Sequence, residues 1–232
     1  MSPVSYTNLP QARWEYAPAV APYQGVSLLD ELPEFAHHVL ESLRQPLEDG
    51  RVALARATGV ADFPARFQLV AAANPCRRGC PALDRCLCTP GERQRYLGKL
   101  SSPLLDRIDL HVELPALAPA ELAAAGTPEA SADVRARVVA ARARQRERFR
   151  GVPGRLNADL SPRQLRRLVS LAPEAARLLA TAMTRLDLSA RAHDRIIKVA
   201  RTIADLAGVD SIGVEHCAEA IQYRSLDRRW RA

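Results

Sequence analysis

The hydrophobic pattern of the sequence changes at about residue 130, and this change constrains the fold more than any other feature. Before it, short apolar runs typical of strands alternate with segments of helical spacing. After it, every periodic segment has helical spacing. A chain of 232 residues is long enough for two small domains. We therefore predict an α/β region followed by an all-α region.

The elements of the first region are predicted from apolar runs, helical spacing and turn residues. They are a strand over 25–29, a helix over 33–45, hairpin strands over 51–57 and 60–63, a buried strand over 67–73, a helix over 92–100 and a strand over 108–114. Asp30-Glu31 follows the first strand, and Asn74-Pro75 follows the strand over 67–73. Open α/β sheets bind ligands at the carboxyl ends of their strands, so these polar residues are candidate site residues.

Beyond an Ala-, Pro- and Gly-rich linker over 116–130, the sequence predicts only helices. Ser131 and Ser189 are expected helix caps, and Gly208 is an expected helix end. The helices are predicted over 133–149, 162–169, 173–186, 190–207 and 214–223. Apolar residues at helical spacing form the expected core, namely Leu165, Leu168, Leu178, Leu179, Met183, Leu186, Ile196, Ile197, Val199, Ile203, Leu206, Ile212 and Ile221. This core needs nothing from the first region, so we expect residues 131–232 to fold independently.

Basic residues are concentrated in the second region. The net charge of the chain is +7, and residues 133–232 hold 21 basic and 11 acidic side chains. All basic residues except Lys99 and Lys198 are arginines, which bind phosphate in a bidentate manner. An arginine-rich composition also follows from genome base composition, so the charge is only a mild indication of a polyanionic partner.

The sequence shows no segment that addresses the chain to a membrane or out of the cell. No apolar run approaches the ~18 residues needed to span a bilayer. The first residues lack the pattern of a secretory signal. We therefore predict a cytoplasmic protein without a membrane partner.

Several segments, in one order, resemble the magnesium-chelatase-like group of AAA+ ATPases, in particular its bacterial ComM-like (YifB-like) members. These segments are Gly25–Phe35, Leu43–Gly50, Phe67–Pro75, Tyr96-Leu97, Ser102–Leu110, Leu188–Arg191 and Val199–Arg228. The resemblance spans residues 25–229 and implies a P-loop NTPase core followed by a helical lid domain. It divides the chain into an unmatched segment over 1–24, a partial core over 25–115, a linker over 116–130 and a lid over 131–232.

The resemblance implies roles for five residues around bound ATP. Asp30 would hold Mg²⁺ through water and Glu31 would polarise the attacking water, since phosphoryl transfer relies on positioning and charge neutralisation. Asn74 resembles the sensor 1 residue, Arg107 the arginine finger offered to a neighbouring subunit, and Arg191 the sensor 2 residue that contacts the ATP phosphates. Singly, each has an ordinary alternative, such as a helix-dipole charge, a turn, an ion pair or a solvated side chain. Their joint occurrence favours the catalytic interpretation.

The hairpin over 51–63 resembles the presensor 1 hairpin of helicase-clade AAA+ proteins, which points into the pore of a ring. Arg56 near its tip would then contact nucleic acid, although an arginine on a hairpin is more often plain surface. For the complete protein, the resemblance implies a hexameric ring that couples ATP hydrolysis to DNA branch migration during uptake and recombination.

The sequence contains no phosphate-binding loop of the form Gly-x₄-Gly-Lys-Ser/Thr (Walker A). The only Gly-Lys pair, Gly98-Lys99, is followed by Leu100 and has Arg93 in place of the first glycine. Because this loop and its lysine hold the β- and γ-phosphates, we expect negligible ATPase activity from the chain by itself. In this interpretation the chain is the C-terminal part of such an ATPase, from a truncated or frameshifted gene.

Four cysteines, Cys76, Cys80, Cys86 and Cys88, have the spacing C-x₃-C-x₅-C-x-C. In a cytosolic chain such a cluster favours a metal site over disulfides, and four thiolates suit tetrahedral Zn²⁺. The related insertion in the family usually reads C-x-C-G and then C-x-C, so reduced, unliganded thiols are the alternative. Cys217 has helical spacing with apolar residues and is expected in the helical core.

Three functions are consistent with these observations. The leading one is a partial AAA+ ATPase that acts on DNA. The second is a noncatalytic module that binds zinc and nucleic acid through the cysteine loop and the basic helix over 133–150. The third is a nonfunctional gene remnant.

Overall fold

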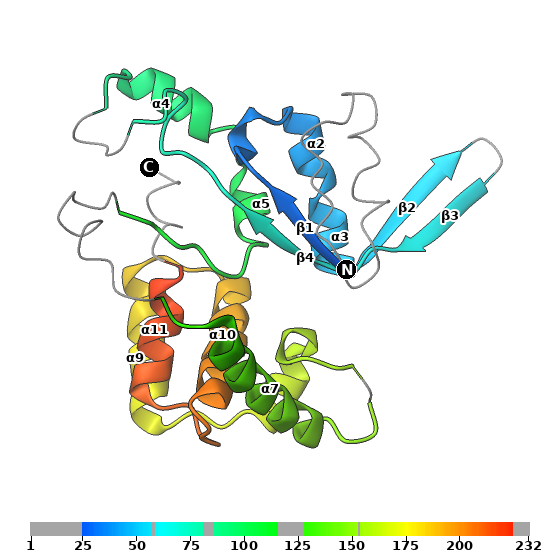
Figure 1. Cartoon of the computed structure of the whole chain (residues 1–232), viewed down its shortest axis with the longest axis vertical. Coiled ribbons are helices and arrows are strands. Elements are labelled where there is room, and N and C mark those ends of the chain that lie inside the picture. The colour runs from blue at the N-terminus through cyan, green and yellow to red at the C-terminus, as the bar shows by residue number, and fades with distance from the viewer. Residues whose placement is uncertain (1–24, 57–58, 81–85, 116–127, 153, 225–232) are drawn as a thin grey trace. The chain divides into compact units, whose positions relative to one another are not determined.

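The computed structural model describes residues 25–56, 59–80, 86–115, 128–152 and 154–224. The chain divides into two compact units between Ile108 and Asp109, and each is described here by itself (Figure 1). The first unit combines strands and helices, and the second is built from helices. The predicted order of an α/β region before a helical region is therefore confirmed. None of the described helices is long and apolar enough to cross a membrane.

The sheet of the first unit pairs strand β1 (Gly25–Leu29) in parallel with β4 (Phe67–Ala71). Along β1, Ser27 and Leu29 are buried while Val26 and Leu28 are exposed, so the side chains alternate between a covered and an open face. The prediction of a buried strand over 67–73 is wrong in this respect. The strand ends at Ala71, and Val70 is 41% exposed because the described residues cover only one face of the sheet.

The single helix predicted over 33–45 is instead three short elements. They are the 3₁₀ turn η2 (Leu32–Glu34), helix α2 (His37–Ser42) and helix α3 (Arg44–Asp49). Pro33 lies in the first turn of η2, as predicted, but Phe35 is extended rather than helical. Pro46 lacks an N–H and is tolerated only in a first turn, so a new helix begins just before it.

The predicted hairpin is present, with β2 (Arg51–Arg56) antiparallel to β3 (Gly59–Pro64). Arg56 pairs with Gly59, so the second strand begins one residue earlier than predicted, and residues 57–58 between the strands lie outside the described residues. Helix α4 (Pro90–Leu97) replaces the helix predicted over 92–100.

The structure differs from the sequence prediction after α4. An unpredicted short helix, α5 (Ser102–Leu105), begins at Ser101, whose hydroxyl accepts a hydrogen bond from the Leu104 N–H at 3.3 Å. The strand predicted over 108–114 is not formed. Leu110, Val112 and Leu114 are exposed, because this segment has no partner strand among the described residues.

The helices of the second unit follow the predicted ranges closely. They are α7 (Ser131–Arg148), η3 (Asn157–Asp159), α8 (Pro162–Leu168), α9 (Pro173–Arg185), α10 (Ala190–Leu206) and α11 (Val214–Gln222). Ser189 caps α10 by accepting a hydrogen bond from the Ala192 N–H at 3.1 Å, and Gly208 follows its end with a φ of 76°. Ser131 is not a cap, because Ala130 holds the cap position and Ser131 is already helical.

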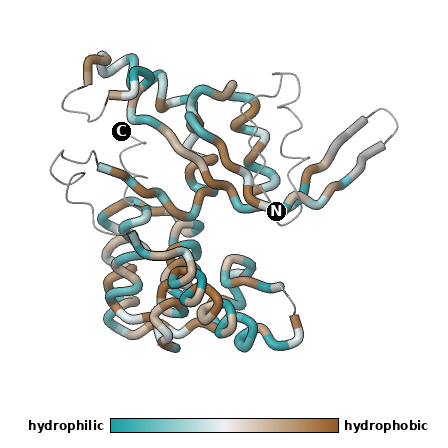
Figure 2. Tube along the Cα trace, in the orientation of Figure 1, coloured by the Kyte–Doolittle hydropathy of each residue, from teal (hydrophilic) through white to brown (hydrophobic). Residues whose placement is uncertain are grey.

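The core of the second unit is formed mainly by helices α8, α9, α10 and α11, along which hydrophobic residues recur (Figure 2). Most of the predicted core residues are buried or packed against this core, and Cys217 is buried in it as expected. Leu206 is an exception at 46% exposed, because it is the last residue of its helix. Ala200 and Ala204, which the apolar face of the helix predicted over 190–207 included, are buried in the core, whereas Ala175 and Ala220 were not predicted.

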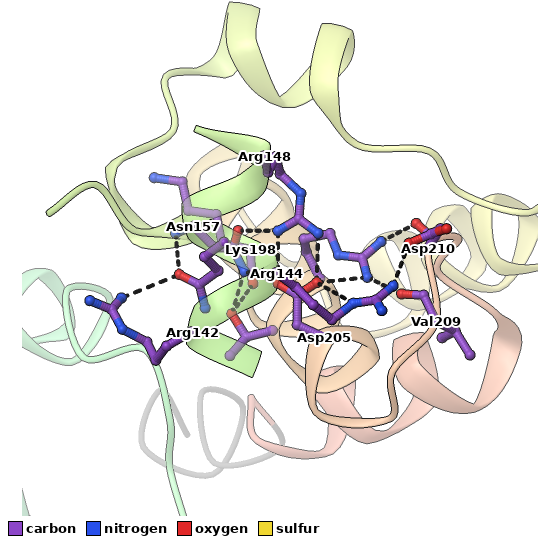
Figure 3. A network of polar contacts seen from close by, with 11 residues as sticks. Arg142, Arg144, Arg148, Asn157, Lys198, Asp205, Val209 and Asp210 are labelled. Carbon is purple, nitrogen blue, oxygen red and sulfur yellow. Dashed lines mark hydrogen bonds and ion pairs between the residues drawn. The ribbon is translucent and has the colours of Figure 1, made fainter. Parts of the chain in front are cut away.

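A buried network of charges joins α7, η3 and α10 (Figure 3). The Asp205 carboxylate is fully buried and accepts hydrogen bonds from Arg148 at 2.6 and 2.7 Å. It also accepts one from the Asn157 amide at 2.9 Å and pairs with Arg201 at 3.0 Å. Arg201 in turn donates to the Val209 and Asp210 carbonyls, so the network fixes the loop after α10.

Candidate functional site

The parallel pairing of β1 and β4 brings Asp30, Glu31 and Asn74 to one edge of the sheet. The two strands run in register up to Leu29 opposite Ala71. Beyond the strands, the Ala72 N–H donates to the Leu29 carbonyl and the Leu32 N–H donates to the Ala72 carbonyl, both at 2.9 Å. These bonds bracket Asp30 and Glu31, and Asn74 lies two residues after Ala72. All three side chains are exposed at this edge.

Glu31 has an unusual backbone conformation for a residue that is not glycine. Its φ of 51° lies in the left-handed region, which in the described part of the chain it shares only with Asp187 among non-glycine residues. Such a conformation is disfavoured and is found often at functional sites. The Asp30 carboxylate accepts a hydrogen bond from the Glu31 N–H at 2.9 Å and so holds this turn. Buried Pro33 follows in η2.

The residues of this edge form a donor set suited to a hard cation. Two carboxylates and an amide oxygen are the oxygen ligands that Mg²⁺ accepts, directly or through its waters. Tyr96 of α4 is buried, which raises its pKa, and the negative charges of Glu34, outside the donor set, and of Glu31 raise this pKa further. The edge can therefore hold a hydrated cation and orient water beside it.

Arg107 is fixed on the first unit by an ion pair and a hydrogen bond to the backbone. Its side chain is 10% exposed and forms an ion pair with Glu48 of α3. It also donates to the Pro103 carbonyl at 2.6 Å. Sequence reasoning missed Glu48 as its partner, because 59 residues separate the two in the chain. The only sequence signal was the location of Glu48 in the segment Leu43–Gly50 that resembles the family.

The remaining predicted site residues lie elsewhere. Arg191 is the second residue of α10 in the second unit, where it is exposed. Arg56 is the last residue of β2, next to the hairpin turn, and its side chain is outside the described part. Within the described part of the first unit, the structure thus gathers Asp30, Glu31 and Asn74 at one edge.

The four clustered cysteines converge on one point. The Sγ atoms of Cys76, Cys80, Cys86 and Cys88 all lie within 4.8 Å of one another. Tetrahedral zinc with Zn–S bonds of about 2.3 Å requires sulfurs about 3.8 Å apart, so a small contraction would complete the site. The Cys80 N–H donates to the Cys76 sulfur at 3.4 Å, a bond that favours a thiolate. The donor set therefore fits a Zn²⁺ ion.

The thiols of this cluster differ in acidity. Burial opposes ionisation of Cys76, but hydrogen bonds from Cys80 and its neighbours outweigh burial and lower its pKa to about 6. Burial and the neighbouring thiols raise the pKa of Cys88 to about 11. The Cys76 sulfur therefore carries negative charge more readily than the Cys88 sulfur, as expected where thiols compete for hydrogen bonds.

The cysteine loop connects the sheet edge to helix α4. Cys76 follows Asn74-Pro75 directly, and Cys88 precedes Thr89, the cap of α4. Thr89 and Glu92 form a reciprocal capping box, in which the Thr89 N–H donates to the Glu92 carboxylate at 2.7 Å. The cysteine cluster is therefore adjacent in the chain to both the sheet edge and the cap of α4.

Two family models match most of the chain. Residues 19–122 match magnesium chelatase, subunit ChlI, and residues 128–224 match the C-terminal part of subunit ChlI. Together with the mixed α/β unit and the helical unit, these matches define the class as a magnesium-chelatase-type protein with its C-terminal domain.

Relatives narrow the class further. The uncharacterized protein YifB of Escherichia coli K12 is 44% identical over 207 residues, which are 89% of this chain and 40% of that protein. The competence protein ComM of Haemophilus influenzae is 45% identical over 205 residues, 88% of this chain and 40% of that protein. The chain belongs to the ComM/YifB-like group of the magnesium-chelatase-like family, as its motifs predicted. It spans about 40% of the length of these relatives.

Proposed function

We propose that the chain supplies the Walker B, sensor and lid part of an ATP-driven AAA+ motor that remodels DNA. The observation that carries this proposal is the convergence of Asp30, Glu31 and Asn74 at one sheet edge in a chain of this family. In the proposed reaction Asp30 holds hydrated Mg²⁺, Glu31 polarises the attacking water and Asn74 orients it. The cation supplies charge neutralisation on the phosphates.

The arginines complete the proposed site. Arg107 acts as the finger offered to a neighbouring subunit of a hexameric ring, with Glu48 as the positioning residue that fixes its guanidinium. Arg191 in the lid contacts the ATP phosphates, and Arg56 on the hairpin contacts DNA. The phosphate-binding loop is supplied by residues outside this sequence.

We further propose that the four cysteines hold a structural Zn²⁺. The ion would tie the loop after Asn74 to the cap of α4 and thereby support the sheet edge. This role is structural rather than catalytic, because four protein ligands leave no open position on the metal.

A hybrid protein tests the proposed reaction. This chain replaces the matching 40% of the Haemophilus influenzae ComM protein, to which it is 45% identical over 205 residues. We expect ATP hydrolysis that Glu31→Gln lowers about 100-fold, the usual contribution of a general base. Glu34→Gln is the matched control, because Glu34 is an exposed acid in the next turn.

Two results would contradict the proposal. One is hydrolysis by the hybrid that Glu31→Gln leaves unchanged. The other is ATP turnover by the 232-residue chain in isolation above that of its own Glu31→Gln variant, because the proposal places the phosphate-binding loop elsewhere.

A noncatalytic module that binds zinc and nucleic acid is the second candidate. The convergence of the four sulfurs favours it, because that site requires nothing outside the described residues. DNA binding by the chain that is salt-dependent and unaffected by nucleotide, together with a hybrid that hydrolyses no ATP, would favour this function over the motor.

A further inference from the structure

The arginines of helix α7 divide into two sets with different surroundings. Arg137 pairs with Glu129, Arg144 with Asp210 and Arg148 with Asp205. Arg135, Arg142 and Arg146 have no carboxylate partner among the described residues, and Arg142 meets only the Gln145 amide at 3.5 Å. In Figure 3, Arg144 and Arg148 converge on the buried acid while Arg142 lies apart.

The three unpaired arginines lie on one face of the helix. Together with Val139 they occupy positions 135, 139, 142 and 146, a spacing of four, three and four residues that places side chains in one row. We call this row the arginine stripe. Its positions span about 16 Å along the helix, and Arg142 and Arg146 are about 6 Å apart in rise. That interval is comparable to the separation of successive phosphates on an extended strand.

The stripe lies on an open surface of the second unit. Arg135, Arg146 and Val139, the last at 52%, are exposed, and Arg142 is half-buried. The only acids within α7, Asp133 and Glu147, are not on the stripe. The stripe therefore presents three cations and an apolar contact without a competing carboxylate of its own helix.

We propose that the arginine stripe binds the backbone of single-stranded DNA. Arginine binds phosphate oxygens in a bidentate manner, and a row of arginines follows a chain of phosphates. Exposed Val139 between the arginines can contact sugars and the faces of unstacked bases. In a duplex, base stacking covers these faces. This inference rests on the proposed DNA partner and assigns that partner a surface on the second unit, in addition to Arg56 on the hairpin of the first unit.

Fluorescence anisotropy of a labelled oligothymidylate tests the stripe on the full chain. The oligonucleotide is about 20 nucleotides long, which exceeds the usual number of nucleotides that one binding site covers. The test variant carries Arg135→Gln, Arg142→Gln and Arg146→Gln. The control carries Arg137→Gln, Arg150→Gln and Arg177→Gln, which remove the same charge from arginines that already pair with Glu129, Glu147 and Glu174. Glutamine keeps a high helix propensity, so circular dichroism should show equal helicity.

We expect the stripe variant to bind at least about 10-fold more weakly at moderate salt, and the control less than about 2-fold. Each lost phosphate contact removes about 0.7 from the slope of log K against log salt, so the slope should fall by about 2 in the stripe variant only. A duplex competitor and polyglutamate should displace the probe less well than unlabelled single strand.

Several results would overturn the proposal. They are equal loss in both variants, no binding by the wild-type chain, preference for duplex, or displacement by polyglutamate as effective as by DNA. Each would leave the hydrolysis test of the hybrid protein intact, because that test measures ATP turnover and not the DNA surface.

Discussion

Replacing Asp205 by asparagine should destabilise the helical unit severely. The side chain of Asp205 is fully buried and is the shared acceptor of Arg148, Arg201 and Asn157. Asparagine has nearly the same shape but no charge, so the two arginines lose their common counterion. Removing one partner from a buried ion pair typically costs about 3–5 kcal/mol, because the remaining charge is buried without compensation.

Thermal unfolding of the full chain, followed by circular dichroism, measures this cost. For a helical unit of this size, 3–5 kcal/mol corresponds to a fall of about 10–20 °C in the melting temperature. The matched control is Asp210→Asn, the same chemical change at a residue whose side chain is 98% exposed and pairs with Arg144. An exposed pair contributes at most about 1 kcal/mol, so the control should melt close to the wild type.

The effect should depend on pH with a defined sign. Burial raises the pKa of Asp205, but the hydrogen bonds from Arg148 and Asn157 and the charge of Arg201 outweigh burial and lower it below the ordinary value. The stabilisation is therefore complete above the unfolded pKa of about 3.9 and is lost as the pH falls through the lower folded pKa. The difference between wild type and Asp205→Asn should be constant from pH 7 to about 5 and shrink below about 4. Coincident melting of the two Asp→Asn variants at pH 7 would refute the reasoning.

Two further predictions concern the cysteine cluster and the helical unit. Elemental analysis should find about one zinc per chain. Cys86→Ser should abolish zinc binding, whereas Cys217→Ser should retain it because Cys217 lies in the helical core. A gently purified wild-type chain without metal would contradict the zinc prediction. A fragment of residues 131–232 should be mostly helical and melt in one sigmoidal transition, because its core cluster draws only on residues 149–221. Weak helicity or gradual melting would show that the unit depends on the rest of the chain.

Local signals in the sequence were sufficient for much of the helical unit. Ser189 at the start of α10 and Gly208 after its end act through neighbours in the chain, and the structure confirms both. The same local reasoning failed at the first unit's helix, where it followed apolar spacing across Phe35 and gave too little weight to Pro46. It failed again over 108–114, because a strand needs a partner that spacing does not reveal.

The amino-acid sequence by itself determined the class of the chain, since ordered motifs carry family membership whatever their surroundings. It also determined which residues were candidates at the sheet edge, because polar residues that follow apolar strands are visible in one dimension. Only the tertiary structure decided the pairing of Arg107 with Glu48, the burial of Asp205 among arginines and the convergence of four sulfurs. Some of these contacts join residues that are far apart in the chain, and others depend on the geometry of a loop. Their energy depends on burial, which no local pattern encodes.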